Sequence, residues 1–293
     1  MKIGRNKQCP CKSGKKYKHC CARTEIPALD PKNIAGLSVS PKEGTAFYIT
    51  KDILLNTLRR DGPIAANRFD QLHENDLREL SELLATTCFL LAEGLKEASN
   101  ANDDLRIACG SLCQNAISTF TGATSLLRDG YYLQSSILVR TILETMATVM
   151  HLIMTPTDLA RFKSNKLDLK VVIQSAKIIV PPFGQMYGMF SETFVHVGSL
   201  HSKPQYVGPH QDDAEARIAN MSFLRFAIWL IFVTVELLFV GIIENGKYWE
   251  KIAPDKVQWR PNEMTLQWQD KFLRANPPKE APRKEEAAPE TVS

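Results

Sequence analysis

The chain has 293 residues, of which 44% are hydrophobic and 23% charged, and its net charge is +4. The hydrophobic content is sufficient for a packed core, which excludes a chain that is too polar to fold. The length suits one large domain or two modest ones. It contains seven cysteines and shows no apolar signal segment after Met1, so we expect a cytoplasmic protein with reduced thiols.

Four of the cysteines lie in two tight pairs near the amino end, Cys9 with Cys11 and Cys20 with Cys21. The members of each pair are too close in sequence to form an unstrained disulfide, and the redox motif Cys-x-x-Cys is absent. Two short chelating arms joined by a turn are typical of a tetrahedral zinc site. The spacing therefore indicates that these thiolates bind a metal. The other three cysteines lie in apolar helical patterns, and we expect them to be buried.

The stretch CPCKSGKKYKHCC, which begins at Cys9, resembles the SEC-C motif. This motif is a small zinc-binding module at the C-terminus of the bacterial preprotein-translocase ATPase and in many other bacterial proteins. The stretch departs from the usual form at Lys12, where glycine is usual. The resemblance implies one structural zinc ion, because protein thiolates fill every ligand position and leave none for water. The rival for the fourth position is His19, and the implied ligands are Cys9, Cys11, Cys20 and Cys21.

The amino-terminal module is strongly basic, because residues 1–23 carry eight basic side chains and no acidic one. With one zinc ion and four thiolates the module keeps a charge of about +6, and the remaining chain carries about −4. This asymmetry predicts docking on an acidic protein surface or on the ribosome or another RNA. The alternative is that the lysines only balance the thiolates. The predicted contact residues are Lys12, Lys15, Lys16 and Lys18.

The rest of the chain is expected to be all-α. Residues 24–45 hold three prolines and two glycines with little periodicity, which indicates a semi-extended linker. Over residues 46–273 apolar residues recur at intervals of three and four, and no strand pair with a hairpin signal stands out. We expect a bundle of about six to eight helices, followed by a disordered tail at 274–293. The expected helices span residues 52–60, 69–98, 103–127, 131–154, 158–180, 183–200 and 212–244.

One stretch, Phe226 to Ile243, contains 18 residues and a single charge, that of Glu236. Its length is sufficient for a membrane span. A bundle of this size also needs one central helix that is covered on all sides, and such helices are uniformly apolar. We expect the central helix, because a charge falls in mid-span and no second span is apparent. A membrane anchor is the alternative.

Two groups of polar residues are candidate sites in the helical region. Arg140 and Glu144 lie one turn apart on an apolar helix, with His151 two turns further along. They form either a polar pocket or an internal ion pair that fixes helix register. A second group follows at Tyr187, Ser191, Glu192, His196 and His201. The candidate catalytic residues are Arg140, Glu144 and His196.

The sequence supports two main functional hypotheses. The first is an adaptor that uses the zinc module to bind a protein or the ribosome, with the helical region as a possible site of homo-oligomerisation. The second is a nuclease or defence-related enzyme, because the helical region resembles the HEPN group and Arg68 and His73 fit its Arg-x4–6-His spacing. That spacing arises easily by chance. No nucleophile elbow or phosphate-binding glycine loop is present, which argues against common hydrolases and NTPases.

Overall fold

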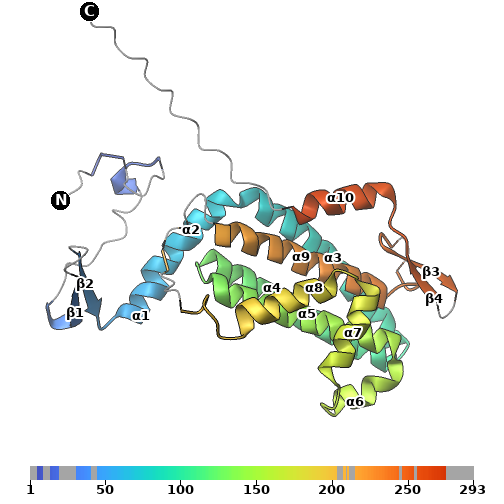
Figure 1. Cartoon of the computed structure of the whole chain (residues 1–293). Coiled ribbons are helices and arrows are strands. Elements are labelled where there is room, and N and C mark those ends of the chain that lie inside the picture. Colours follow the sequence, from blue (N-terminus) through green and yellow to red (C-terminus); the bar gives the residue numbers. More distant parts are fainter. Residues whose placement is uncertain are drawn as a thin grey trace, which may run out of the picture. The chain divides into compact units, whose positions relative to one another are not determined.

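The computed structural model describes residues 5–8, 14–19, 31–40, 45–202, 207–208, 210, 215–243, 246–253 and 256–274 (Figure 1). The chain forms two compact units. The N-terminal unit contains Met1–Phe69, Arg128–Gly130 and Gln205–His210, and the helical unit contains the rest. The expected tail beyond residue 274 and residues 24–30 and 41–44 of the expected linker lie outside the described residues.

The N-terminal unit contains a β-hairpin that the sequence analysis missed. Strands β1 (Ile34–Ser40) and β2 (Thr45–Thr50) pair antiparallel, with Ile34 opposite Thr50. The expectation that the chain contains no strand pair is therefore wrong at this point. The sequence does carry a strand pattern, but over only a few residues. Leu37 and Val39 alternate with serines in β1, and β2 is rich in β-branched and aromatic residues.

A helix also continues where the sequence indicated a stop. Helix α1 (Ile53–Asn56) runs through a π-helical turn, η4 (Thr57–Asp61), into α2 (Gly62–Leu72). The helix expected at residues 52–60 was to end before Asp61, Gly62 and Pro63. Pro63 is the second residue of α2 and directly follows the π-helical turn, in which the N–H of Gly62 donates to the carbonyl of Thr57; proline is tolerated in the first turn of a helix.

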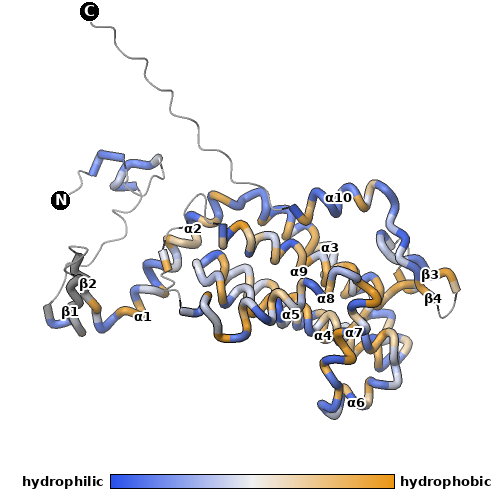
Figure 2. Tube along the Cα trace, viewed as in Figure 1, coloured by the Kyte–Doolittle hydropathy of each residue, from blue (hydrophilic) through white to orange (hydrophobic). Residues whose placement is uncertain are grey.

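The helical unit is built from four long helices, α3 (Glu74–Asn100), α4 (Asp104–Arg128), α5 (Tyr132–Met154) and α9 (Glu215–Leu238). Helix α9 packs against α3 and α5 (Figure 1). The Ser135 hydroxyl of α5 donates to the carbonyl of Ala123 in α4 at 2.9 Å. The expectation of a mainly helical fold is confirmed, and Figure 2 maps hydropathy along the same trace. Cys109 and Cys113 are buried as expected, whereas Cys88 is exposed.

Shorter elements complete the helical unit. The expected helix at 158–180 is divided into α6 (Leu159–Lys163) and α7 (Leu169–Ile179). Helix α8 (Phe183–Phe190) ends in a π-helical turn, η6 (Ser191–Val195). A second hairpin, β3 (Trp249–Ala253) with β4 (Lys256–Trp259), was also missed, and α10 (Glu263–Leu273) follows it.

Helix α9 is the central helix that the apolar stretch predicted. Every residue from Leu224 to Leu238 is buried. By length and composition both α5 and α9 could cross a membrane, but 83% of the apolar window of α9 is buried inside this fold, against 50% for α5. Glu236 is one of these buried residues of α9, and its Oε1 accepts a hydrogen bond from the N–H of Tyr248, just before β3, at 2.8 Å. Burial raises the pKa of this carboxyl group, and backbone N–H donors from the same segment oppose the rise.

Candidate functional sites

The described part of the amino-terminal module forms a chain that doubles back on itself. Gln8 and Lys16 form an antiparallel bridge, and the N–H of Tyr17 donates to the carbonyl of Lys7 at 2.8 Å. Gly14, in the turn between them, has a φ of +68°, which is strained for any other residue. A short 3-10 turn, η1 (Tyr17–His19), follows. The residues flanking the two cysteine pairs are thus drawn together.

This backbone fits a zinc site, since two chelating arms must converge through a turn to share one ion. The four cysteines themselves lie outside the described residues, so their role as ligands stays a prediction. His19, the rival ligand, is exposed at the end of η1. Within the part of the chain that the structure describes, no cluster of three or more His, Cys, Asp or Glu could hold a metal. Lys15 and Lys16 are exposed, as a contact surface requires.

Comparison with known proteins assigns the amino-terminal module. Residues 5–23 match the SEC-C motif, a metal-binding module known from SecA. The chain is similar to protein translocase subunit SecA of Treponema pallidum (strain Nichols), with 77% identity over 22 residues. The match covers 8% of this chain and 2% of that protein, so it concerns the module alone. No solved structure matches the chain.

The two candidate groups of the helical region meet in one cluster. Nη1 of Arg140 lies 2.9 Å from Oε2 of Glu144 along α5. The Tyr187 hydroxyl of α8 donates to the other oxygen of Glu144 at 3.0 Å and accepts from Nη2 of Arg140 at 3.0 Å. Nε of Arg140 donates to the Ser191 hydroxyl at 3.2 Å. We call these four residues the Arg140 cluster.

The Arg140 cluster is a closed hydrogen-bonded set. The arginine and glutamate side chains are 20% and 25% exposed. Each of them pairs with the other and hydrogen-bonds to Tyr187, and the arginine also hydrogen-bonds to Ser191. Burial, together with the charge of Glu144, raises the pKa of Tyr187. The arrangement ties α8 to α5, which favours the interpretation of an ion pair that fixes helix register over that of an open pocket.

The third candidate catalytic residue does not join the Arg140 cluster. His196 is exposed just beyond η6, and no hydrogen bond or ion pair links it to Arg140 or Glu144 among the described residues. His201, from the same group, instead stabilises its own loop. Its Nδ1 accepts the N–H of Gly198 at 3.2 Å, and its Nε2 lies 3.1 Å from the carbonyl of Phe194.

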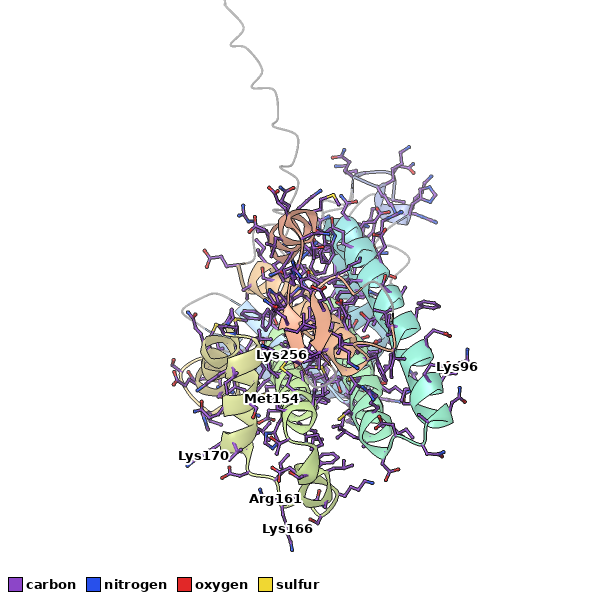
Figure 3. The ribbon with its side chains drawn as sticks, turned by 90° about the vertical axis from the view of Figure 1, so that its right-hand side faces the viewer. Lys96, Met154, Arg161, Lys166, Lys170 and Lys256 are labelled. Carbon is purple, nitrogen blue, oxygen red and sulfur yellow. The ribbon has the colours of Figure 1, made fainter. Side chains whose placement is uncertain are left out.

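The side chain of His151 makes structural contacts with Ser175 and Asp158. Its Nδ1 lies 2.9 Å from the Ser175 hydroxyl of α7, and its Nε2 lies 2.9 Å from Oδ2 of Asp158. The hydrogen bond with His151, with help from Arg161, lowers the pKa of Asp158. Ser175 is 9% exposed, so its hydroxyl is not open to a substrate. The contact fixes α7 beside the end of α5, whose last residue, Met154, is labelled in Figure 3.

A second polar arrangement, which the sequence analysis missed, lies at the junction of α2 and α3. Nδ1 of His73 lies 2.7 Å from Asp76, and its Nε2 accepts from Nε of Arg217 at 2.8 Å. Asp76 also accepts from Arg225. We call these four residues the buried charge network, because each is at most 2% exposed. The HEPN-like spacing therefore places its histidine inside the helical core.

The electrostatics of the buried charge network favour an ionised aspartate. Burial raises the pKa of Asp76, but the hydrogen bonds from His73 and Arg225 and the charge of Arg225 outweigh it and hold the pKa below its ordinary value. Arg225 has two further partners, Glu79 at 2.6 Å and the carbonyl of Phe272 at 2.8 Å. The network thus joins α3, α9 and α10.

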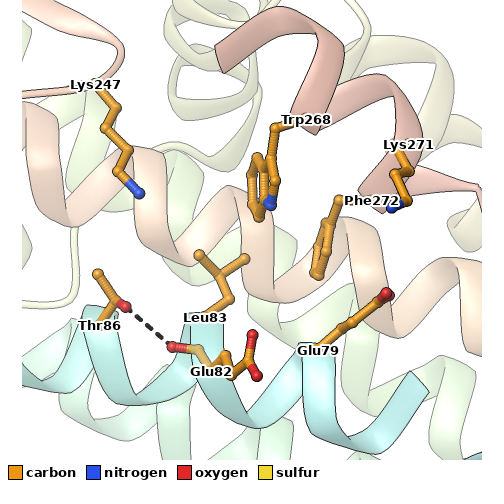
Figure 4. Close-up of a pocket in the computed structure, with 8 residues that line it drawn as sticks. All are labelled: Glu79, Glu82, Leu83, Thr86, Lys247, Trp268, Lys271 and Phe272. Carbon is orange, nitrogen blue, oxygen red and sulfur yellow. Dashed lines mark hydrogen bonds between the residues drawn. The ribbon is translucent and has the colours of Figure 1, made fainter. Parts of the chain in front are cut away.

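A groove lies between α3 and α10, beside the buried charge network (Figure 4). Its volume is about 270 Å³. The rings of Trp268 and Phe272 are stacked with centroids 4.9 Å apart, and Nζ of Lys247 lies 5.9 Å from the Trp268 ring. No residue of this groove was singled out from the sequence. The lining residues are Glu79, Glu82, Leu83, Thr86, Lys247, Trp268, Lys271 and Phe272.

Proposed function

We propose that this protein is a binding protein whose SEC-C segment holds one structural zinc ion and presents a basic surface to an acidic partner. The observation that carries the proposal is the SEC-C match at residues 5–23. The proposed ligands are Cys9, Cys11, Cys20 and Cys21. When bound, zinc supplies cross-linking rather than reactivity, because four thiolates leave no position for water.

Charge supports a partner that is acidic. Lys15 and Lys16 are exposed on the doubled-back segment, and residues 1–23 contain no acidic side chain that would neutralise them. Exposed cations that lack nearby acids raise the rate of encounter with an acidic surface. The binding hypothesis is preferred to the enzyme hypothesis because Arg140 and Glu144 are engaged with Tyr187 and Ser191 rather than with His196.

The proposal is tested by capturing cellular partners with the full chain while measuring zinc in the same preparation. The wild type is compared with Cys9→Ser, with Lys15→Gln/Lys16→Gln, and with the control Lys96→Gln/Lys256→Gln, which removes two exposed lysines elsewhere. We expect stoichiometric zinc in all but the first variant. Partner capture should fall in the first two variants and persist in the control.

Treatment of the captured material with ribonuclease separates the two kinds of acidic partner. An RNA-mediated contact is lost on digestion, whereas a direct contact with an acidic protein survives. Capture that is equally strong in the wild type and in both module variants would refute the proposal. Absence of zinc from freshly reduced wild-type protein would refute the ligand assignment.

A further inference from the structure

The exposed face of α7 carries a repeated pair of side chains. Lys170 and Val171 recur seven residues later as Lys177 and Ile178, which places the two pairs on one side of the helix, two turns apart. Val171 is 48% exposed and Ile178 is 70% exposed. A single exposed aliphatic side chain needs no explanation, but two on the same face of one helix form an exposed apolar feature of the kind found at interaction surfaces.

This face is held outward by the opposite side of the same helix. Val172, Ile173 and Ala176 are buried, and α7 packs against both α5 and α8. The contact of Ser175 with His151 fixes the rotation of the helix further. The exposed lysine and aliphatic pairs are therefore a fixed feature of the surface.

Cations without acidic partners extend the surface around α7. Arg161 and Lys163 pair with acids, at 3.3 Å and 3.2 Å respectively. By contrast, Lys166, Lys170 and Lys177 make no ion pair with any residue that the structure describes. In Figure 3 the side chains of Lys166 and Lys170 project away from the ribbon at this end of the helical unit. These ammonium groups are available to an anionic partner.

Two further apolar side chains are exposed at helix ends in this part of the helical unit. Met154, at the end of α5, is 46% exposed, and Leu169, at the start of α7, is 42% exposed. Phosphate groups of RNA would pair with the lysines but would gain nothing from aliphatic side chains, since RNA is bound by stacking on aromatic ones. A bilayer of anionic lipid matches both features, because lysines reach the headgroups while aliphatic side chains enter the boundary beneath them.

We propose that the α6–α7 end of the helical unit docks on an anionic lipid surface through Lys166, Lys170 and Lys177, with Val171 and Ile178 inserted at the headgroup level. Each lysine near such a surface strengthens binding about fivefold, so the three together contribute about a hundredfold. The two aliphatic side chains add about tenfold more. This surface does not depend on the SEC-C segment.

The test is co-sedimentation of the full chain with vesicles of phosphatidylcholine, with and without 30% phosphatidylglycerol, roughly the anionic range that attracts polybasic segments. The charge variant is Lys166→Gln/Lys170→Gln/Lys177→Gln, and the aliphatic variant is Val171→Ser/Ile178→Ser. Their controls are Lys96→Gln/Lys256→Gln and Met264→Ser, which alter exposed lysines and a 76% exposed methionine elsewhere. Circular dichroism verifies that each variant is folded.

We expect binding to anionic vesicles only, reduced about a hundredfold in the charge variant and about tenfold in the aliphatic variant, with both controls unchanged. Because the SEC-C segment is basic, Lys15→Gln/Lys16→Gln is measured in parallel and should leave the dependence on Val171 and Ile178 intact. Failure of the wild type to bind anionic vesicles would overturn the proposal. So would binding that needs the lysines but not the aliphatic pair, which would indicate electrostatic attraction to any polyanionic surface rather than docking with insertion.

Discussion

Replacement of Asp76 by asparagine should destabilise the helical unit strongly. The substitution keeps the shape of the side chain but removes the charge that faces Arg225, which is completely buried. Because Arg217 donates to Nε2 of His73, the Nδ1 of that ring carries the proton, and Asp76 accepts from both this N–H and Arg225. An asparagine has one acceptor oxygen, so its N–H₂ group would meet one of these two donors as donor against donor. Breaking one side of a buried charge pair costs about 3–5 kcal/mol of the free energy of unfolding.

The same arginine provides an internal control. Glu79 also pairs with Arg225, at 2.6 Å, but its side chain is 39% exposed, so water replaces the contact when the charge is lost. We expect Glu79→Gln to lower the free energy of unfolding by about 1 kcal/mol or less. In thermal unfolding followed by circular dichroism at pH 7, Asp76→Asn should lower the midpoint by about 10 °C and Glu79→Gln by about 3 °C.

The pH dependence gives a second measurement of the same effect. The pKa of Asp76 is lower in the folded chain than in the unfolded one. Its contribution is therefore complete above the unfolded pKa and is lost as the pH falls through the folded one. The difference in stability between wild type and Asp76→Asn should shrink below about pH 4. Equal destabilisation by the two variants, or a difference independent of pH in that range, would refute the reasoning.

Three further predictions concern the module, the Arg140 cluster and the thiols. Cys9→Ser should abolish zinc binding, worth on the order of 10 kcal/mol to such a module, and leave the helical circular dichroism signal unchanged; a large loss of helix would contradict separate folding. Tyr187→Phe removes two hydrogen bonds to charged groups and should cost about 1–2 kcal/mol in urea unfolding, against no change if the contacts are not formed. In zinc-loaded native protein at pH 8, a thiol reagent should modify Cys88 well before Cys109 and Cys113. Burial raises the pKa of Cys109 to about 12 and that of Cys113 further, so both thiols stay protonated. Equal rates of modification would show that the core opens.

The helices were largely predictable because their signal is local. Apolar spacing located α4 and α5 to within a residue at each end, and uniform apolarity identified α9 as the central helix. The two hairpins were missed because each strand is only four to seven residues long and is set by pairing across a turn. The break at His73 between α2 and α3 gave no glycine or proline signal.

The candidate site residues could also be grouped from the sequence only where they lie close together along the chain. Arg140 and Glu144 could be paired from the sequence, since they lie one helical turn apart, and the SEC-C motif follows from its spacing. Tyr187 could not be assigned to that pair, because 43 residues separate it from Glu144 and only the packing of α8 on α5 brings them together. His196 was grouped with them on residue type alone, and the structure leaves it apart.

The wide separation of these partners along the chain also constrains the order of folding during synthesis. Asp76 meets Arg225 across 149 positions, and that arginine meets the carbonyl of Phe272 a further 47 positions on. A nascent chain that has emerged only as far as α5 must therefore hold an uncompensated acidic group on a surface destined for the interior. Early helices should remain loosely associated until α9 leaves the ribosome, and chaperones that shield partly assembled bundles would act in that interval.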